Sequence, residues 1–143
     1  MSDELLIQPN MEALVSAFLR NQPELTALVD DRIYTALPKE PEYPCVRVVQ
    51  LLSTPTGSPL YAVAYEVQGE AFGGSKAEAW RIASTAQALI DARIEGVHEG
   101  FGVVNGTRPG AMIDLPDEAF EPAKPRWLFT STIYARPGAT VSS

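Results

Sequence analysis

The residue types that most often carry out chemistry are scarce in this chain and do not form a motif. Cys45 and His98 are the only cysteine and the only histidine, which excludes a metal site built on two histidines. No motif supports a Cys–His or Ser–His pair, and a solvated histidine beside Glu99 is the simpler interpretation. The sequence therefore predicts no catalytic residue and no cofactor.

A glycine-containing segment, FGGSK at 72–76, is the one candidate for binding a phosphate, because helix N-termini bind anions. The pattern GxxxxGK[ST] is absent, since the order here is Ser75 then Lys76. Glu70, just upstream, would repel a phosphate. We interpret the segment as the start of a helix that Ser75 caps, with Glu78 bonding back to Ser75 as in a capping box.

Two pairs of adjacent acidic residues could approach a divalent cation: Asp30 with Asp31, and Asp117 with Glu118. Neither pair has a third oxygen ligand at a suitable spacing. Adjacent carboxylates of this kind are more typical of solvated or capping residues, so no metal site is predicted.

The elements that must position any functional residue are organised around a strand and helix at 60–92. Alternation predicts a strand with an apolar face and a polar face; the apolar residues are Tyr61, Val63, Tyr65 and Val67, and the others are Ala62, Ala64, Glu66, Gln68 and Glu70. The following helix has a narrow apolar stripe of Ala79, Ile82, Ala83, Ala86 and Ile90. We expect this stripe to pack on the apolar face of the strand, and Gly96 to end the helix.

The remaining segments extend this sheet and its helical layer. Asn10 should cap a first helix, and Pro23 should begin a short second one. Strands are predicted at 32–36, 45–52 and 127–134, with an exposed hairpin tip at 53–59. Glycine and proline predict a loop with one or two short strands at 97–114 and a surface connection at 115–125. Residues 1–9 and 136–143 are predicted to be loose ends of a single domain spanning 1–143.

The composition excludes several classes of function. Eighteen acidic and eleven basic residues give the 143-residue chain a net charge of −7, whereas nucleic-acid binding needs clustered Lys and Arg. No apolar run approaches the roughly 20 residues of a membrane span. One cysteine and a start without a basic or long apolar segment favour a soluble cytoplasmic product.

The order of these elements resembles the tail-terminator, or tail-completion, proteins of long-tailed phages with non-contractile tails. The resemblance is carried by a helical pair running into PELTALVDDRIY, a proline-rich extension into YPCVRVV, a polar hairpin, a second long strand and an alanine-rich helix ending in QALI. Its most specific part is LTALVDDRIY at 25–34, followed by Pro44 at the head of a strand. The similarity covers about residues 10–134.

This resemblance implies an α+β domain with a mostly antiparallel or mixed sheet and helices packed on one face. It implies a ring, expected to be a homohexamer, at the head-proximal end of the tail tube. Such a ring ends tube polymerisation and docks to the head connector protein, while DNA passes through it. The partners would be other copies of the chain, the tail-tube protein and the connector. The protein would be made in the host cytoplasm and located in the virion at the head–tail junction.

A ring gives possible roles to five residues. Glu66, Gln68 and Glu70 could line the bore and keep it neutral or acidic, so that DNA is not held. Alternatively, this face could pack against a neighbouring subunit, with Glu66 or Glu70 paired to Arg47 on the adjoining strand or to an arginine across the interface. Trp80 projects away from the alanine stripe, so it would lie under the 97–125 loops or in a subunit interface.

Segments 53–59 and 97–125 are predicted to contact neighbouring subunits, tube or connector, because they are long and polar. A tail-tube or head-closure ring protein is an alternative in the same class. A small cytoplasmic enzyme or ligand-binding domain is an alternative from another class. A closed pocket between sheet and helix, holding His98 or Cys45 beside carboxylates, would favour it.

Overall fold

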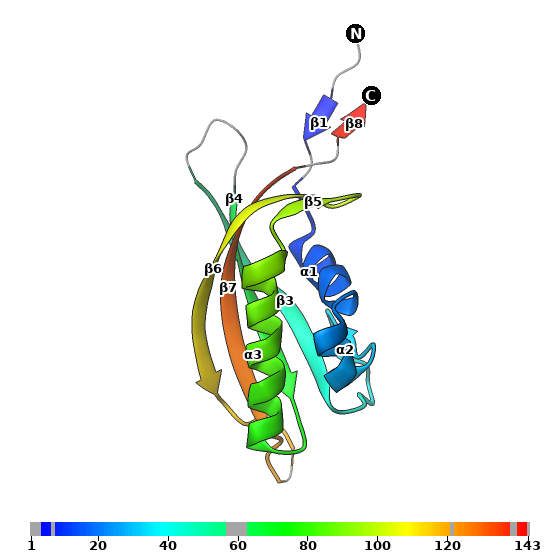
Figure 1. The fold of residues 1–143 in the computed structure, drawn as a ribbon, viewed down its shortest axis with the longest axis vertical. Helices are drawn as coiled ribbons and strands as arrows, with labels where there is room; N and C mark the ends of the chain where they lie inside the picture. Colours follow the sequence, from blue (N-terminus) through cyan, green and yellow to red (C-terminus); the bar gives the residue numbers. More distant parts are fainter. Residues whose placement is uncertain (1–3, 7, 57–62, 121, 138–139, 143) are drawn as a thin grey trace.

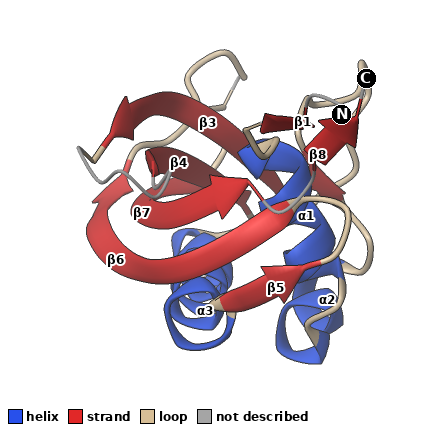
Figure 2. Ribbon diagram, turned by 90° about the horizontal axis from the view of Figure 1, so that it is seen from above, coloured by secondary structure: helices blue, strands red, loops and turns tan. Residues whose placement is uncertain are grey.

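The protein is an α+β domain in which a curved sheet carries its helices on one side, as the sequence predicts (Figures 1 and 2). The structure is a computed structural model and describes residues 4–6, 8–56, 63–120, 122–137 and 140–142. The helices are α1 (Met11–Arg20), α2 (Pro23–Val29) and α3 (Lys76–Arg93). The strands are β1 (Glu4–Leu6), β2 (Ile33–Tyr34), β3 (Cys45–Pro55), β4 (Val63–Phe72), β5 (Gly96–His98), β6 (Gly102–Asp114), β7 (Arg126–Pro137) and β8 (Thr140–Ser142).

The main sheet has the strand order β2-β3-β4-β7-β6-β5. The pair β2–β3 is parallel, and every other pair in this sheet is antiparallel. The short parallel strand comes directly after α2, and it makes the sheet mixed. The central strand β4 lies beside β7 along its whole length, from Val63 opposite Ala135 to Phe72 opposite Arg126.

Helix α3 packs on the sheet through the predicted alanine stripe. Its buried residues are Ala79, Ile82, Ala83, Ala86, Leu89 and Ile90. The small side chains let the helix approach β4 and β7 closely. The Ser75 hydroxyl accepts a hydrogen bond from the Glu78 amide at 3.1 Å. The Glu78 carboxylate accepts from the Gly74 amide at 2.7 Å, not from Ser75, so the reciprocal bond reaches one residue further back than predicted.

Helices α1 and α2 complete the layer above β3 and β4. Asn10 caps α1 by accepting from the Ala13 amide at 3.1 Å, and Pro23 opens α2. The buried side of α1 includes Met11, Leu14, Val15, Phe18 and Leu19. An Arg20 guanidinium donates to the Ile33 carbonyl, which ties the end of α1 to β2.

The centre of the core needs a glycine. Gly69 on β4 faces Phe129 on β7, and the Phe129 ring is fully buried over it. A Cβ at Gly69 would lie 2.1 Å from atoms of that ring, so the aromatic side chain occupies the volume that the glycine leaves free.

The loop prediction for 97–114 is wrong for most of that segment. It contains β5 and the 13-residue strand β6. Two register irregularities, between Val104 and Gly106 and between Pro109 and Met112, interrupt the pairing with β7. Each irregularity breaks the alternation by which a strand is recognised. The dipeptide Asn105-Gly106 lies at the first irregularity and not in a hairpin turn.

Strand β3 continues three residues beyond the predicted end at 52, because 53–55 still pair with β4. The rest of the predicted hairpin tip, apart from Thr56, and Tyr61 on the predicted strand lie outside the described residues. At the two ends of the chain, β1 and β8 pair with each other, from Glu4 opposite Ser142 to Leu6 opposite Thr140. They form a ribbon separate from the main sheet (Figure 1).

Candidate assembly surface

The side of the main sheet that faces away from the helices is the candidate assembly surface, and we call it the outer face. Strand register places residues on it in rows that cross four strands. One row joins Arg47, Glu70, Leu128 and Ile113, and another joins Leu52, Glu66, Thr132 and Arg108. The polar residues that the sequence analysis proposed for a bore or an interface therefore all lie on this one face. They are Arg47, Glu66, Gln68 and Glu70.

One end of the outer face is closed by ion pairs. The Glu70 side chain is only 5% exposed. Its Oε2 lies 2.5 Å from Arg47 Nε, and its Oε1 lies 3.5 Å from Arg126 Nη1. Arg126 also lies 3.8 Å from Asp117 Oδ2. Two carboxylates thus balance two guanidiniums, as a buried charge requires, and Glu70 is paired to Arg47 on the adjoining strand within one chain.

An aromatic group covers this closed end. The ring of Tyr43 contacts Phe72 and Phe120 with centroids 5.8 and 6.0 Å away, and Lys124 Nζ lies 3.8 Å from the Tyr43 centroid. Cys45 is fully buried in the same region. Burial raises the pKa of its thiol to about 11, although Arg32 and Lys124 oppose the shift. Such a thiol is protonated at neutral pH and is unsuited to act as a nucleophile.

The other end of the outer face is open. Glu66 and Gln68 are half-buried between strands, and no ion pair of Glu66 occurs among the described residues. Arg108 on β6 and Arg136 on β7 are exposed here. Sequence reasoning missed Arg108 on this face because 97–114 was interpreted as loop. The charges of the open end are therefore one carboxylate and two guanidiniums, so this end is not acidic.

Trp80 lies on the opposite side of the sheet, on α3. It precedes Gln87 by two helical turns and so shares its side of the helix. The Gln87 side-chain amide donates to the carbonyls of Gly110 and Thr130, at 3.1 and 3.0 Å, which turns this side of α3 toward β6. Trp80 itself is 50% exposed. Half of the indole is therefore uncovered in the single chain.

Further large apolar side chains are exposed near the two long edges of the sheet. Leu51 and Leu52 on β3 are 48% and 50% exposed, and Ile113 on β6 is 51% exposed. Leu51 and Leu52 thus lie at the β3 edge and Ile113 at the β6 edge. Trp80 lies toward β6 on the helix side of the sheet. Exposed apolar groups of this kind, gathered along strand edges, are typical of surfaces that another chain covers.

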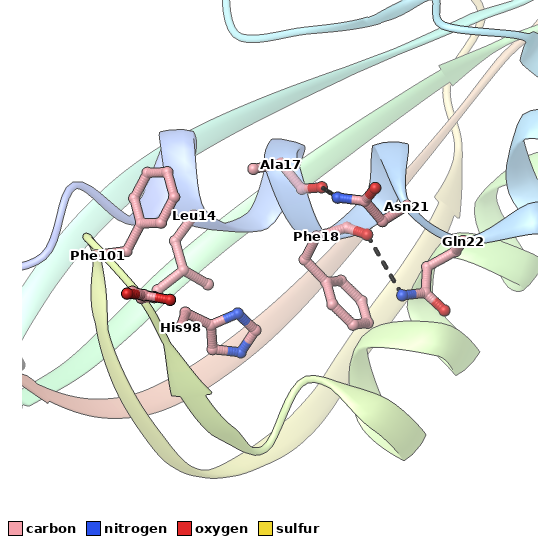
Figure 3. Close-up of a pocket in the computed structure, with 8 residues that line it drawn as sticks. Leu14, Ala17, Phe18, Asn21, Gln22, His98 and Phe101 are labelled. Atoms are coloured by element: carbon pink, nitrogen blue, oxygen red, sulfur yellow. Dashed lines mark hydrogen bonds between the residues drawn. The ribbon is translucent and has the colours of Figure 1, made fainter.

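The sequence left open a ligand pocket holding His98, and Figure 3 shows that region. A surface hollow of about 230 Å³ is lined by Leu14, Ala17, Phe18, Asn21, Gln22, His98, Glu99 and Phe101. It lies between α1 and the β5–β6 turn and opens to solvent. His98 Nε2 lies 2.6 Å from the Ile94 carbonyl, so that nitrogen donates and does not act as a base.

Neither candidate for binding an ion gains support. Among the described residues no group of His, Cys, Asp and Glu side chains could hold a metal ion. At the start of α3, the Gly74 and Glu78 amides bond to Glu78 and Ser75 side chains. These amides are therefore engaged within the chain, and the segment 72–76 is a helix cap.

Comparisons with known proteins show which family and which fold the chain resembles. The family model described as tail completion protein gp17 matches residues 13–109. A chain from a structure titled "Virion of native gene transfer agent (GTA) particle" has the same fold, with a TM-score of 0.69 and 15% sequence identity over 88% of this chain and 94% of that chain. Among curated proteins, none matches the sequence. In the described part of the chain, no helix is long and apolar enough to cross a membrane.

The family match covers more than half of the chain and includes the run at 25–34 on which the resemblance rests. It agrees with the family that the sequence pattern indicates. The chain belongs to the tail completion protein gp17 family and is a structural protein of a phage-like tail, located in the virion.

Proposed function

We propose that this protein forms a ring, a homohexamer, at the head-proximal end of the tail tube. The ring ends polymerisation of the tube protein and presents a docking surface to the head connector. The observation that carries this proposal is the outer face: an antiparallel sheet that the helices leave bare, bounded by two free edges with exposed apolar side chains. Exposed apolar side chains along free strand edges are typical of surfaces that another chain covers, and a ring would cover both edges.

In this ring the outer face lines the bore. Glu66 and Gln68 are the accessible members of the predicted lining, while Glu70 and Arg47 neutralise one another at the closed end. The full set of charges on the face includes Arg126 and Asp117, Arg108 and Arg136. Of the charged side chains named on this face, three are carboxylates and four are guanidiniums, so the lining has a net excess of one positive charge per chain and is near neutral and not acidic. On this proposal so small an excess holds DNA only weakly.

The helices then form the outside of the ring, and the exposed connection at 115–120 and 122–125 contacts tube or connector. This connection lies at the end of the sheet where β6 finishes and β7 begins, and it projects from the body in Figure 1. Because this connection lies at one end of the subunit, it is better placed to contact the tube or the connector along the ring axis than to contact a neighbouring subunit.

The test is light scattering and negative-stain microscopy of the purified protein, alone and with tail tubes. Short rings that cap one end of each tube are expected. A filament formed by the protein alone would favour a tube protein. Binding to the head portal in the absence of tubes would favour a head-closure protein, and a monomer that leaves tube length unchanged would refute the ring.

A further inference from the structure

Both long edges of the main sheet have backbone groups without a partner strand. Strand β2 pairs with β3 only at Val46 and Arg47, and β5 pairs with β6 only at 102–104. In the described residues, no strand pairs with β3 beyond Arg47 on that side, or with β6 beyond Val104. The Glu12 side chain accepts from the Gln50 amide at 2.8 Å, so the accessible part of the β3 edge is 51–55.

The two free edges lie at the same level of the sheet. The row through Leu52 ends at Arg108, and the row through Thr54 ends at Gly106. Strand β2 blocks β3 below this level, and β5 blocks β6 above it. At this level register, however, the neighbour's β2 would meet the end of β6, because Val46 and Arg47 lie in the rows that end at Asp114 and Ile113. If the neighbour's β3 is shifted along β6 toward Asp114, the neighbour's β2 moves further from β5 of the first copy. Closing a ring with tilted strands favours such a shift.

The directions of the strands also match. Strands β3, β4, β7 and β6 alternate in direction, so β3 and β6 of one chain run opposite ways. Rotation about the ring axis gives the next copy the same strand directions and the same inward-facing side of the sheet as the first. The neighbour's β3 must then lie antiparallel to β6. Strand β6 pairs with β5 and β7 in the same antiparallel way.

Side chains near the edges are complementary. On the β6 edge, Trp80 lies on the helix side, and Ile113 and Arg108 lie on the outer face. On the β3 edge, Leu51 and Leu52 are half exposed, and Glu66 lies one strand further in. With strands about 4.8 Å apart, Arg108 is within two strand spacings of the neighbour's Glu66. Apolar contacts and opposite charges would thus meet across the join.

From these edges we infer that the ring is closed by antiparallel pairing between residues 51–55 of β3 in one copy and the free edge of β6 in the next. The inference rests on the proposed ring and names its subunit interface. Pro109 lacks an amide hydrogen, and the two irregularities of β6 interrupt its edge. Pairing is therefore restricted to short stretches, which protects the free chain from open-ended strand addition.

Cysteine pairs test this interface. The variants Arg108→Cys with Leu52→Cys, and Arg108→Cys with Thr54→Cys, join the two edges at the level register and at a two-residue shift. The control is Leu52→Cys with Val97→Cys, because Val97 is 78% exposed on the edge strand β5. Native Cys45 is buried and should not react. After mild oxidation, either edge pair should give a ladder up to the closed ring on a non-reducing gel, and the control should stay monomeric.

Rings visible by microscopy without a ladder from either edge pair would overturn the inference and leave the ring itself standing. A ladder only from the control would move the interface to β5 and also overturn it. Absence of rings in the unmodified protein would remove the proposed function and this interface together. Reduction should return every cross-linked species to the monomer band, which separates disulfides from aggregation.

Discussion

The two ends of the outer face are built from the same alternating strands, but in the described part of the chain the charged side chains are paired within the chain at one end and not at the other. At the closed end, Glu70 is buried between Arg47 and Arg126. At the open end, Glu66 lies on the same side of the same strand, four residues earlier, without an ion pair among the described residues. The difference comes from neighbouring strands and from the covering segment around Asp117, not from β4 itself.

This contrast shows that a polar strand face does not have one role along its length. Charges that the chain satisfies internally support the fold, because removing one partner leaves the others buried without compensation. Charges that the chain leaves open are available to another molecule. The four predictions below alter one end, or a site away from both, in order of decreasing effect on stability.

The largest effect is expected for Glu70→Ala. This change leaves Arg47 and Arg126 facing each other without their carboxylate, and should lower the free energy of unfolding by about 3 kcal/mol. The matched change Glu66→Ala should alter it by less than about 0.5 kcal/mol. Urea denaturation of both variants provides the measurement. An equal loss at the two positions would abolish the distinction between the ends.

A smaller loss is expected for Ser75→Ala, which affects neither end of the outer face. Removing the hydroxyl that accepts from the Glu78 amide should cost about 1 kcal/mol, measured in the same urea series. Ring formation should be unchanged, because the Ser75 hydroxyl is used within the helix cap. Loss of assembly in a variant that is still folded would assign a binding role to the start of α3.

A change in assembly with little change in stability is expected for Trp80→Ala. Half of the indole is already exposed, so the free energy of unfolding should move by less than about 1 kcal/mol. The fraction of protein in rings should fall, since buried tryptophan often dominates an interface. Sedimentation at several concentrations measures this, with Val97→Ala as an exposed apolar control. Equal ring formation in both variants would remove Trp80 from the interface.

The smallest effect on stability is expected for Glu66→Lys combined with Gln68→Lys, which adds two positive charges per chain to the open end and removes one negative charge. Rings should still form if this face lines the bore, in a smaller yield, because the inferred β3–β6 pairing is made by backbone groups and Glu66 adds to it only through its charge facing Arg108 of the next copy. DNA should then pass slowly or be retained, and the retention should weaken as salt increases, because phosphate contacts are screened. The readout is DNA ejection from assembled particles in a salt series. Complete failure of the rings to form would instead show that the polar face of β4 itself packs against the neighbouring subunit, and the lining assignment would be wrong.

Much of the fold could be predicted from the sequence because its signals are local. The alanine stripe of α3, the Asn10 and Ser75 caps and the alternation of β4 each depend on residues within a turn or two of one another. Strand β6 could not be recognised, since its alternation is broken by two irregularities and by Pro109. With β6 missing, Arg108 could not be placed on the outer face.

The candidate site was predictable only in part, for the same reason. Alternation on β4 and β3 places Glu66, Gln68, Glu70 and Arg47 on one face. It does not reveal that Arg126 and Asp117, from more than 40 residues further along the chain, close one end of that face. Likewise, a helical projection shows that Trp80 leaves the stripe. Only the position of β6 shows that the indole flanks a free edge.

The pairing of β1 with β8 brings the first and last strands of the chain side by side. A short linker could therefore join the original ends, and new ends could be opened in the exposed connection between β6 and β7. Such a circular permutant would keep every strand pair of the main sheet. In an assembled tail, a label at the original ends and a label at the new ends would lie at opposite ends of the same subunit. Comparing the two labels by microscopy would reveal which end of the subunit faces the tube.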